Sequence, residues 1–115
     1  MIYVIDHKDS FTHNVVHQLS LFDEVECDNY NNVDKIKLSK ARVIVFSPGP
    51  GNPKNYPLTS KIYYQFKGKK KIIGICLGFQ QILFCEGAQI VEQNKIYHGY
   101  QSNIKAVSYT HLTLP

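Results

Sequence analysis

The sequence has 115 residues, enough for one small domain with a modest core. Hydrophobic residues make up 43% of the chain and charged residues 19%, which is typical of a globular protein and not of a disordered one. No apolar stretch approaches the length of a membrane span, and the first residues lack the basic and apolar regions of a signal peptide. An odd number of cysteines, three, without a secretory signal predicts reduced thiols and a cytoplasmic location.

The net charge of +4 comes largely from the segment "KGKKK", residues 67–71. This segment is either a solvated loop before a strand or a patch that binds phosphate. No aromatic residues interleave with the lysines, so the sequence does not favour nucleic-acid binding. No histidines and cysteines have the spacing of a zinc site, and we expect neither a metal nor a cofactor.

The first half of the chain alternates between strand and helix patterns. Residues 2–6 form a short apolar run, a predicted buried strand. A helix is predicted to follow, capped by Asp9 or Ser10. Its apolar positions recur at helical spacing: Phe11, Val15, Val16, Leu19 and Phe22. Residues 24–29 indicate a second strand, and 41–47 a third; between them the chain is predicted to be a loop with a short helical turn.

The second half repeats this alternation. Residues 48–57 are too rich in proline and glycine to lie inside an element, and a weak helical pattern follows at 58–66. Residues 71–76 indicate a strand, 77–87 a helix ended by a glycine, and 88–93 another strand. Strands that alternate with helices predict an α/β fold, a doubly wound and mostly parallel sheet with helices on both faces.

The strand at 71–76 ends in a cysteine with a glycine two residues before it and another two residues after it. Gly74, Cys76 and Gly78 have the spacing of a nucleophile elbow, in which a strand turns at once into a helix and the neighbours must be small. The elbow exposes the thiol at a helix N-terminus, where the dipole favours a thiolate. The alternative is a buried cysteine at a strand end, beside two incidental glycines.

A second candidate is the loop "SPGPGNP", residues 47–53, directly after a predicted buried strand. Its glycines expose backbone N–H groups that can form part of an oxyanion hole, although an ordinary turn has the same composition. Loops at the carboxyl ends of parallel strands converge on one crevice. We therefore expect this loop and Cys76 to lie at the same edge of the sheet.

Four segments together resemble one family. "SPGPGNP" with "GICLGFQ" is similar to the paired signature of class I (triad-type) glutamine amidotransferases, whose fold is flavodoxin-like. The opening "VIDHKDSFTHNVVHQL" and the segment "HGYQSNI" resemble the glutaminase subunits of anthranilate synthase and aminodeoxychorismate synthase. The matches occur in the family's order, cover residues 1–106, and imply the N-terminal part of such a domain. One departure is Phe79, where the family usually has histidine.

The resemblance implies roles for individual residues. Cys76 would attack the carboxamide of glutamine, form a thioester and release ammonia. The backbone N–H groups of Leu77 and Gly51 would form the oxyanion hole. The residues that would contact glutamine are Gly49, Pro50, Gly51 and Gln80. The residues that would face a chorismate-using synthase subunit (component I) are His98, Gly99 and Ser102.

The family's general base and its orienting acid belong to a His-x-Glu segment, which this sequence does not contain. We therefore expect the sheet to be incomplete at its C-terminus and the chain to be inactive by itself. Residues 107–115, "VSYTHLTLP" from Val107, resemble translated adapter sequence, and we interpret them as a non-native tail; the alternative is a divergent strand. His111 is not taken as a base.

Three other functions remain open from sequence. An amidotransferase-like chain could bind glutamine or a synthase without catalysis. The same signatures occur in the glutaminase domains of carbamoyl phosphate and GMP synthetases, which lack the "DSFT" opening. A different cysteine-elbow hydrolase, such as a peptidase, is disfavoured by "SPGPG" and "DSFT".

Overall fold

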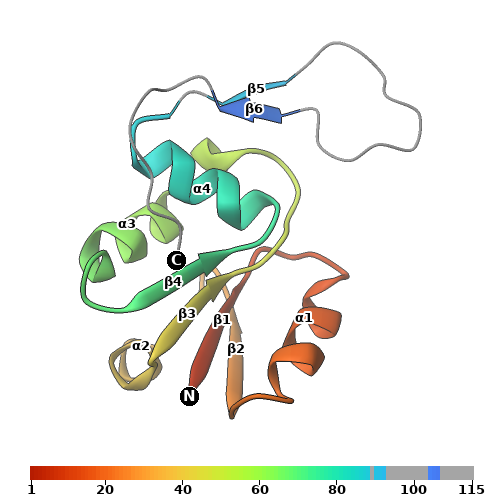
Figure 1. The fold of residues 1–115 in the computed structure, drawn as a ribbon, viewed down its shortest axis with the longest axis vertical. Coiled ribbons are helices and arrows are strands. Elements are labelled where there is room, and N and C mark those ends of the chain that lie inside the picture. Colours follow the sequence, from red (N-terminus) through yellow and green to blue (C-terminus); the bar gives the residue numbers. More distant parts are fainter. Residues whose placement is uncertain (89, 93–103, 107–115) are drawn as a thin grey trace.

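The computed structural model describes residues 1–88, 90–92 and 104–106. Figure 1 shows helices on both sides of a central sheet whose strands run in one direction. The elements in chain order are β1 (Ile2–Asp6), α1 (Thr12–Leu19), β2 (Val25–Asn29), α2 (Lys35–Lys40), β3 (Val43–Phe46), a 3-10 turn (Pro53–Asn55), α3 (Pro57–Phe66), β4 (Lys71–Gly74), α4 (Leu77–Cys85), β5 (Ile90–Glu92) and β6 (Ile104–Ala106).

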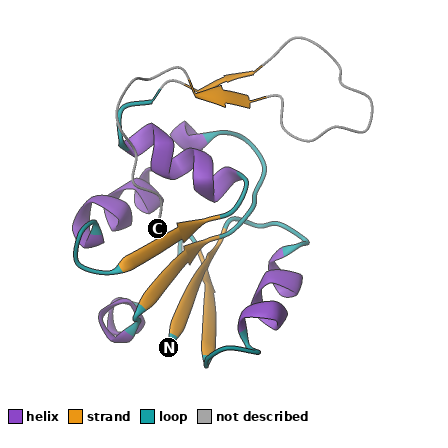
Figure 2. Ribbon diagram, in the orientation of Figure 1, coloured by secondary structure: helices purple, strands orange, loops and turns teal. Residues whose placement is uncertain are grey.

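The main sheet has the order β2-β1-β3-β4, and all of its pairs are parallel. The loops after β1, β3 and β4 therefore gather at one edge of the sheet, as the strand arrows show in Figure 2. The predicted α/β fold with a parallel sheet is confirmed. β5 forms the centre of the strand predicted at 88–93, and it pairs antiparallel with β6 in a separate two-stranded sheet.

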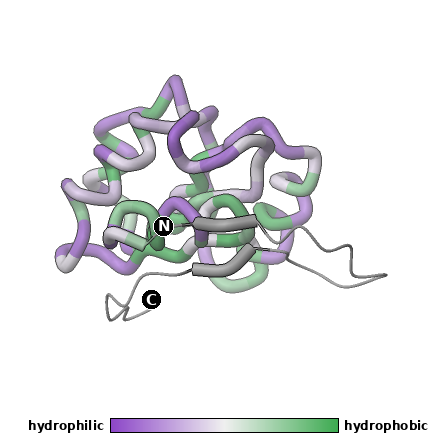
Figure 3. The backbone as a smooth tube through the Cα atoms, turned by 90° about the horizontal axis from the view of Figure 1, so that it is seen from above, coloured by the Kyte–Doolittle hydropathy of each residue, from purple (hydrophilic) through white to green (hydrophobic). Residues whose placement is uncertain are grey.

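Alternate residues of the strands face two different cores, because successive side chains in a strand point to opposite faces. On one face, Tyr3 and Phe46 are fully buried against side chains of α2, α3 and α4. On the other face, Val4 and Val45 are buried, and α1 packs against them. Figure 3 shows hydrophobic segments at the centre of the chain and hydrophilic ones around them.

α1 is shorter than the sequence predicted. Its N-cap position is Phe11, which makes no side-chain cap, so the predicted caps were wrong. Asp9 instead accepts a hydrogen bond from the Phe11 N–H at 2.7 Å, in the turn before the helix. Phe11 is 63% exposed and Phe22 83% exposed, so neither belongs to the packed face that the spacing predicted.

Candidate active site

Cys76 lies between β4 and α4 and has a backbone conformation that few residues adopt. Its φ is 53° and its ψ is −111°, and the side chain is exposed. The N–H of Gly78 donates to the carbonyl of Ile75 at 2.9 Å, which closes the turn around the cysteine. A non-glycine residue at positive φ is strained, and such strain is concentrated at functional sites. The strand-to-helix elbow predicted from the spacing is present.

The two glycines of the elbow are required by close backbone approaches. A Cβ added to Gly74 would lie 2.5 Å from the N of Phe79. A Cβ added to Gly78 would lie 2.6 Å from the carbonyl carbon of Phe46 on β3. Both distances are shorter than any ordinary carbon contact, so α4 can follow β4 this tightly only with glycine at both positions.

The proline-glycine loop after β3 rests against this elbow. A Cβ on Gly49 would lie 2.8 Å from Cδ2 of Leu77, the first residue of α4, and 2.7 Å from the carbonyl oxygen of His7. Gly51 has a φ of 82°, which glycine adopts without strain. The predicted meeting of the loop and the elbow at one sheet edge is therefore observed.

The loop is stabilised by side chains that follow it. The phenol of Tyr56 donates to the carbonyl oxygen of Pro50 at 2.6 Å. Asn52 and Asn55 form a reciprocal capping box around the 3-10 turn, with the Asn52 N–H donating to Asn55 Oδ1 at 2.9 Å. These bonds give the loop a defined conformation beside Cys76.

His7 is completely buried beneath the loop and is fully hydrogen-bonded. Its Nδ1 lies 3.1 Å from the carbonyl oxygen of Ser47, and its Nε2 lies 2.9 Å from Oγ1 of Thr59. The neutral tautomer satisfies both contacts, with Nδ1–H donating to Ser47 and Nε2 accepting from Thr59. Burial lowers the pKa of His7, although the Ser47 carbonyl and the charge of Asp6 oppose this effect.

No side chain among the described residues is hydrogen-bonded to the thiol of Cys76. Both ring nitrogens of His7 are occupied elsewhere. His13 and His17 are exposed on α1, which packs on β1 and β2, so the expectation of a solvated face is confirmed. None of these three histidines is therefore placed as a base for the cysteine.

The N–H groups of Leu77 and Gly51 have no hydrogen-bond acceptor within the part of the chain that the structure describes. They lie on the two segments that Gly49 brings together. Gln80 is half-buried on α4, one turn after Cys76, and its N–H donates to the Cys76 carbonyl at 3.0 Å. His98, Gly99, Ser102 and the tail at 107–115 lie outside the described residues.

Three side chains at this site escaped the sequence reasoning or were assigned no role there: His7, Tyr56 and Gln81. Gln81 is completely buried, and its Nε2 donates to the carbonyl of Pro53 at 3.0 Å and to that of Tyr56 at 3.2 Å. Gln81 therefore ties α4 to the loop. The only local signal was a polar residue on the apolar face of a predicted helix.

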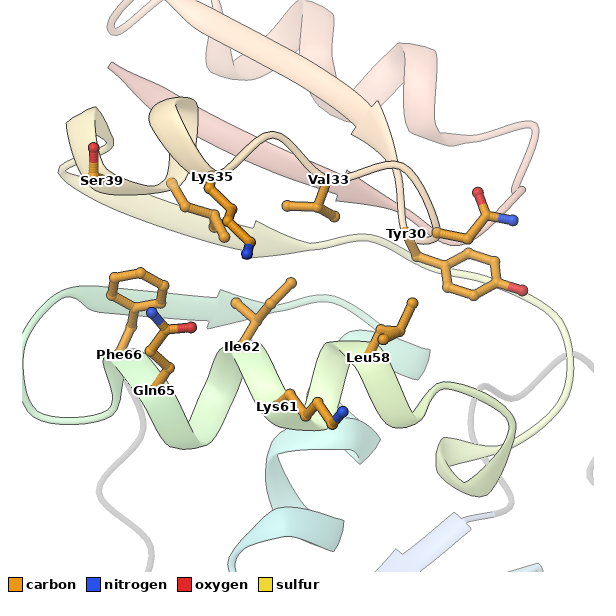
Figure 4. Close-up of a pocket in the computed structure, with 11 residues that line it drawn as sticks. Tyr30, Val33, Lys35, Ser39, Leu58, Lys61, Ile62, Gln65 and Phe66 are labelled. Carbon is orange, nitrogen blue, oxygen red and sulfur yellow. The ribbon is translucent and has the colours of Figure 1, made fainter.

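A hollow of about 510 Å³ lies elsewhere, between α2 and α3 (Figure 4). Leu38, Ile62 and Phe66 give it an apolar lining, and Lys35 and Lys61 are at its rim. Its lining includes neither Cys76 nor the proline-glycine loop, so it is separate from the candidate active site.

The lysine-rich segment makes contacts within the protein. Lys67 forms an ion pair with Glu86, and Lys70 Nζ donates to the carbonyl of Ser39 at 2.8 Å. These contacts hold the segment against its neighbours. Among the described residues, no helix is long and apolar enough to cross a bilayer, and no cluster of side chains could hold a metal ion.

A parallel α/β sheet with a cysteine on a strained turn between strand and helix defines a nucleophile-elbow protein. Over residues 3–113 the chain matches the glutamine amidotransferase class-I family. The chain therefore belongs to that family, and the resemblance noted from the sequence motifs is confirmed at this level.

Two curated relatives illustrate the match. Anthranilate synthase component 2 of Lactococcus lactis is 35% identical over 113 residues, which are 94% of this chain and 55% of the relative. Aminodeoxychorismate/anthranilate synthase component 2 of Bacillus subtilis is 33% identical over 108 residues, 91% of this chain and 56% of the relative. The chain thus spans about half the length of these relatives.

The fold also matches the solved structure of a GMP synthase protein from Thermoplasma acidophilum. The TM-score is 0.69 at 25% sequence identity, and the match covers 82% of this chain and 48% of that chain. This similarity agrees with the parallel sheet and the elbow described above.

The first prediction concerns Gly78. We expect Gly78→Ala to lower the free energy of unfolding by about 3 kcal/mol or more, because its Cβ would overlap β3 backbone. The effect is opposite to the gain of up to about 1 kcal/mol expected for alanine in a helix. Urea unfolding followed by circular dichroism measures it. Gly68→Ala is the control: it adds a Cβ at positive φ in open space and should cost only about 1 kcal/mol. Equal losses in the two variants would contradict the packing argument.

The second prediction concerns the buried His7. The unfolded chain binds a proton near the ordinary histidine pKa of about 6.5, whereas the lowered pKa keeps the folded form neutral. Stability should therefore fall as the pH drops below about 6.5, by up to ~1.4 kcal/mol per pH unit. Urea unfolding between about pH 5 and 7.5 tests this. The double variant His13→Gln, His17→Gln should keep the slope, and a flat profile in the unchanged protein would rule out a neutral buried His7.

Proposed function

We propose that this chain carries the nucleophile and the oxyanion donors of a glutaminase that supplies ammonia to a chorismate-using synthase. The observation that carries the proposal is the exposed Cys76 at a strained elbow, directly beside a proline-glycine loop. Family membership and the names of the relatives support the choice of glutamine and of the anthranilate or aminodeoxychorismate branch.

The proposed reaction begins with attack of the Cys76 thiolate on the carboxamide carbon of glutamine. The carbonyl oxygen becomes negatively charged and is stabilised by the free N–H groups of Leu77 and Gly51. The C–N bond then breaks, the nitrogen takes up a proton and leaves as ammonia, and a γ-glutamyl thioester remains on the sulfur. Water hydrolyses the thioester to glutamate and restores the thiol.

Binding of glutamine is assigned to backbone and side chains around the elbow. Gly49, Pro50 and Gly51 form the wall beside the thiol, and Gln80 on the first turns of α4 contacts the substrate. His98, Gly99 and Ser102 are proposed to face the synthase subunit. We further propose that residues 1–106 are the N-terminal part of the amidotransferase domain and that 107–115 are a non-native tail.

The proton transfers need a general base, and the family's His-x-Glu segment does not occur in this sequence. His7 cannot serve, because both of its ring nitrogens are bonded to Ser47 and Thr59. We therefore propose that the 115-residue chain does not turn over glutamine by itself. A domain extended with the second half of a relative would supply the base.

The test compares glutamine hydrolysis by the 115-residue chain with that by a chain extended with the C-terminal half of a matched relative. The extended chain should release ammonia, and Cys76→Ser in it should lower the rate about a thousand-fold or more. Cys27→Ser, a half-buried cysteine on β2, should leave the rate nearly unchanged. Turnover by the short chain would refute the absence of a base. Binding of glutamine without turnover by the extended chain would favour the non-catalytic module.

A further inference from the structure

The segment Gly49-Pro50-Gly51-Asn52 has the features of a type II turn. Proline favours the second position of such a turn, and the third position requires a positive φ, which Gly51 has at 82°. Type I and type II turns differ by a flip of the central peptide, which here joins Pro50 to Gly51. Glycine tolerates either sign of φ, so its own stereochemistry does not choose between the two orientations.

The orientation of this peptide decides where the Gly51 N–H points. The carbonyl of Pro50 and the N–H of Gly51 belong to one planar trans unit, so they point in opposite directions. The Tyr56 phenol donates to that carbonyl at 2.6 Å. A bond on one side of the plane thereby fixes the direction of the donor on the other side.

Tyr56 is itself held in place on three sides. Its ring centroid lies 4.7 Å from that of His7 and 4.8 Å from that of Tyr30, with both contacts edge-on. Burial raises the pKa of Tyr56, so the phenol keeps the proton that it donates. Gln81 Nε2, from α4, donates to the Tyr56 carbonyl at 3.2 Å. The donor hydroxyl is thus anchored to the same helix that begins at the elbow.

Gln81 has an unusual feature that supports this role. Its Oε1 is buried and has no hydrogen-bond partner within the described residues. An unsatisfied buried oxygen costs about 1–3 kcal/mol, so this side chain is not optimal for stability. Its amide nitrogen must face the carbonyls of Pro53 and Tyr56, because the opposite orientation would place oxygen against oxygen.

We propose that Tyr56 is a positioning residue that holds the Pro50–Gly51 peptide in one orientation and aims the Gly51 N–H at the oxyanion, with Gln81 anchoring Tyr56 to α4. The inference rests on the proposed glutaminase function, since it assumes that Gly51 is a donor. Without the phenol, the turn would populate both orientations, and part of the protein would lack this donor.

The test uses the variant Tyr56→Phe, which removes one oxygen and keeps the ring between His7 and Tyr30. Tyr63→Phe is the matched control, because this buried phenol on α3 donates to Glu86 and not to the loop. Losing a bond to a charged partner should destabilise the control at least as much as losing a neutral one destabilises Tyr56→Phe. A loss of stability alone therefore cannot explain a change seen only in Tyr56→Phe.

Two measurements are made on the 115-residue chain. The first is alkylation of Cys76 by the L- and D-forms of a chloroketone analogue of glutamine, in which sulfur displaces chloride while the ketone oxygen occupies the oxyanion site. Iodoacetamide, which lacks the amino-acid group, reports the intrinsic access and reactivity of the thiol. The second is the NMR cross-peak between Pro50 Hα and Gly51 HN, which is strong in the type II orientation and weak in type I.

We expect Tyr56→Phe to weaken the cross-peak and to slow L-chloroketone alkylation about ten-fold, a fraction of the loss seen when an oxyanion donor is removed outright. Its iodoacetamide rate should stay unchanged, and Tyr63→Phe should match the unchanged protein in all three. An unaltered cross-peak or chloroketone rate in Tyr56→Phe overturns the inference. Equal rates for the L- and D-forms in the unchanged protein would instead refute the glutaminase proposal, while the cross-peak still decides whether Tyr56 orients the peptide.

Discussion

The strained backbone of Cys76 is the constraint on which the rest of the site depends. A φ of 53° is unfavourable for a residue with a side chain, so the packing on both sides of the turn must hold it. Gly74 and Gly78 allow that packing, because their missing side chains let α4 lie directly on β4 and on the Phe46 carbonyl of β3. The exposed thiol is thus a consequence of how closely the helix approaches the sheet.

The same close packing brings a second strand's loop to the thiol. Gly49 fits between His7 and Leu77, so the end of β1, the loop after β3 and the start of α4 form one packed unit. His7 contributes to this unit as a neutral, buried hydrogen-bonding side chain and not as a base. A polar side chain in such a position must be fully satisfied, which explains why its partners come from two separate segments.

The parts of the fold that were predictable from sequence are those with local signals. Short apolar runs between glycines and prolines indicated the strands, and the spacing of Gly74, Cys76 and Gly78 indicated the elbow. The extent of α1 was mispredicted because apolar spacing continues to Phe22, beyond the last helical residue. The role of His7 was not predictable, since it depends on a contact with Thr59, 52 residues away.

The assembly around Cys76 has a consequence for how the activity can be divided. Every contact that shapes the thiol and its two free N–H groups is made by residues 1–88, within β1, β3, α4 and the loops that join them. Oxyanion stabilisation depends on such fixed donors, whereas turnover also needs proton transfer. Covalent capture of a glutamine analogue and hydrolysis of glutamine are therefore separable properties, and the first can be measured without the second. Recognition of the substrate's electrophilic carbon is built into the geometry of this half of the fold, whatever group supplies the proton transfers.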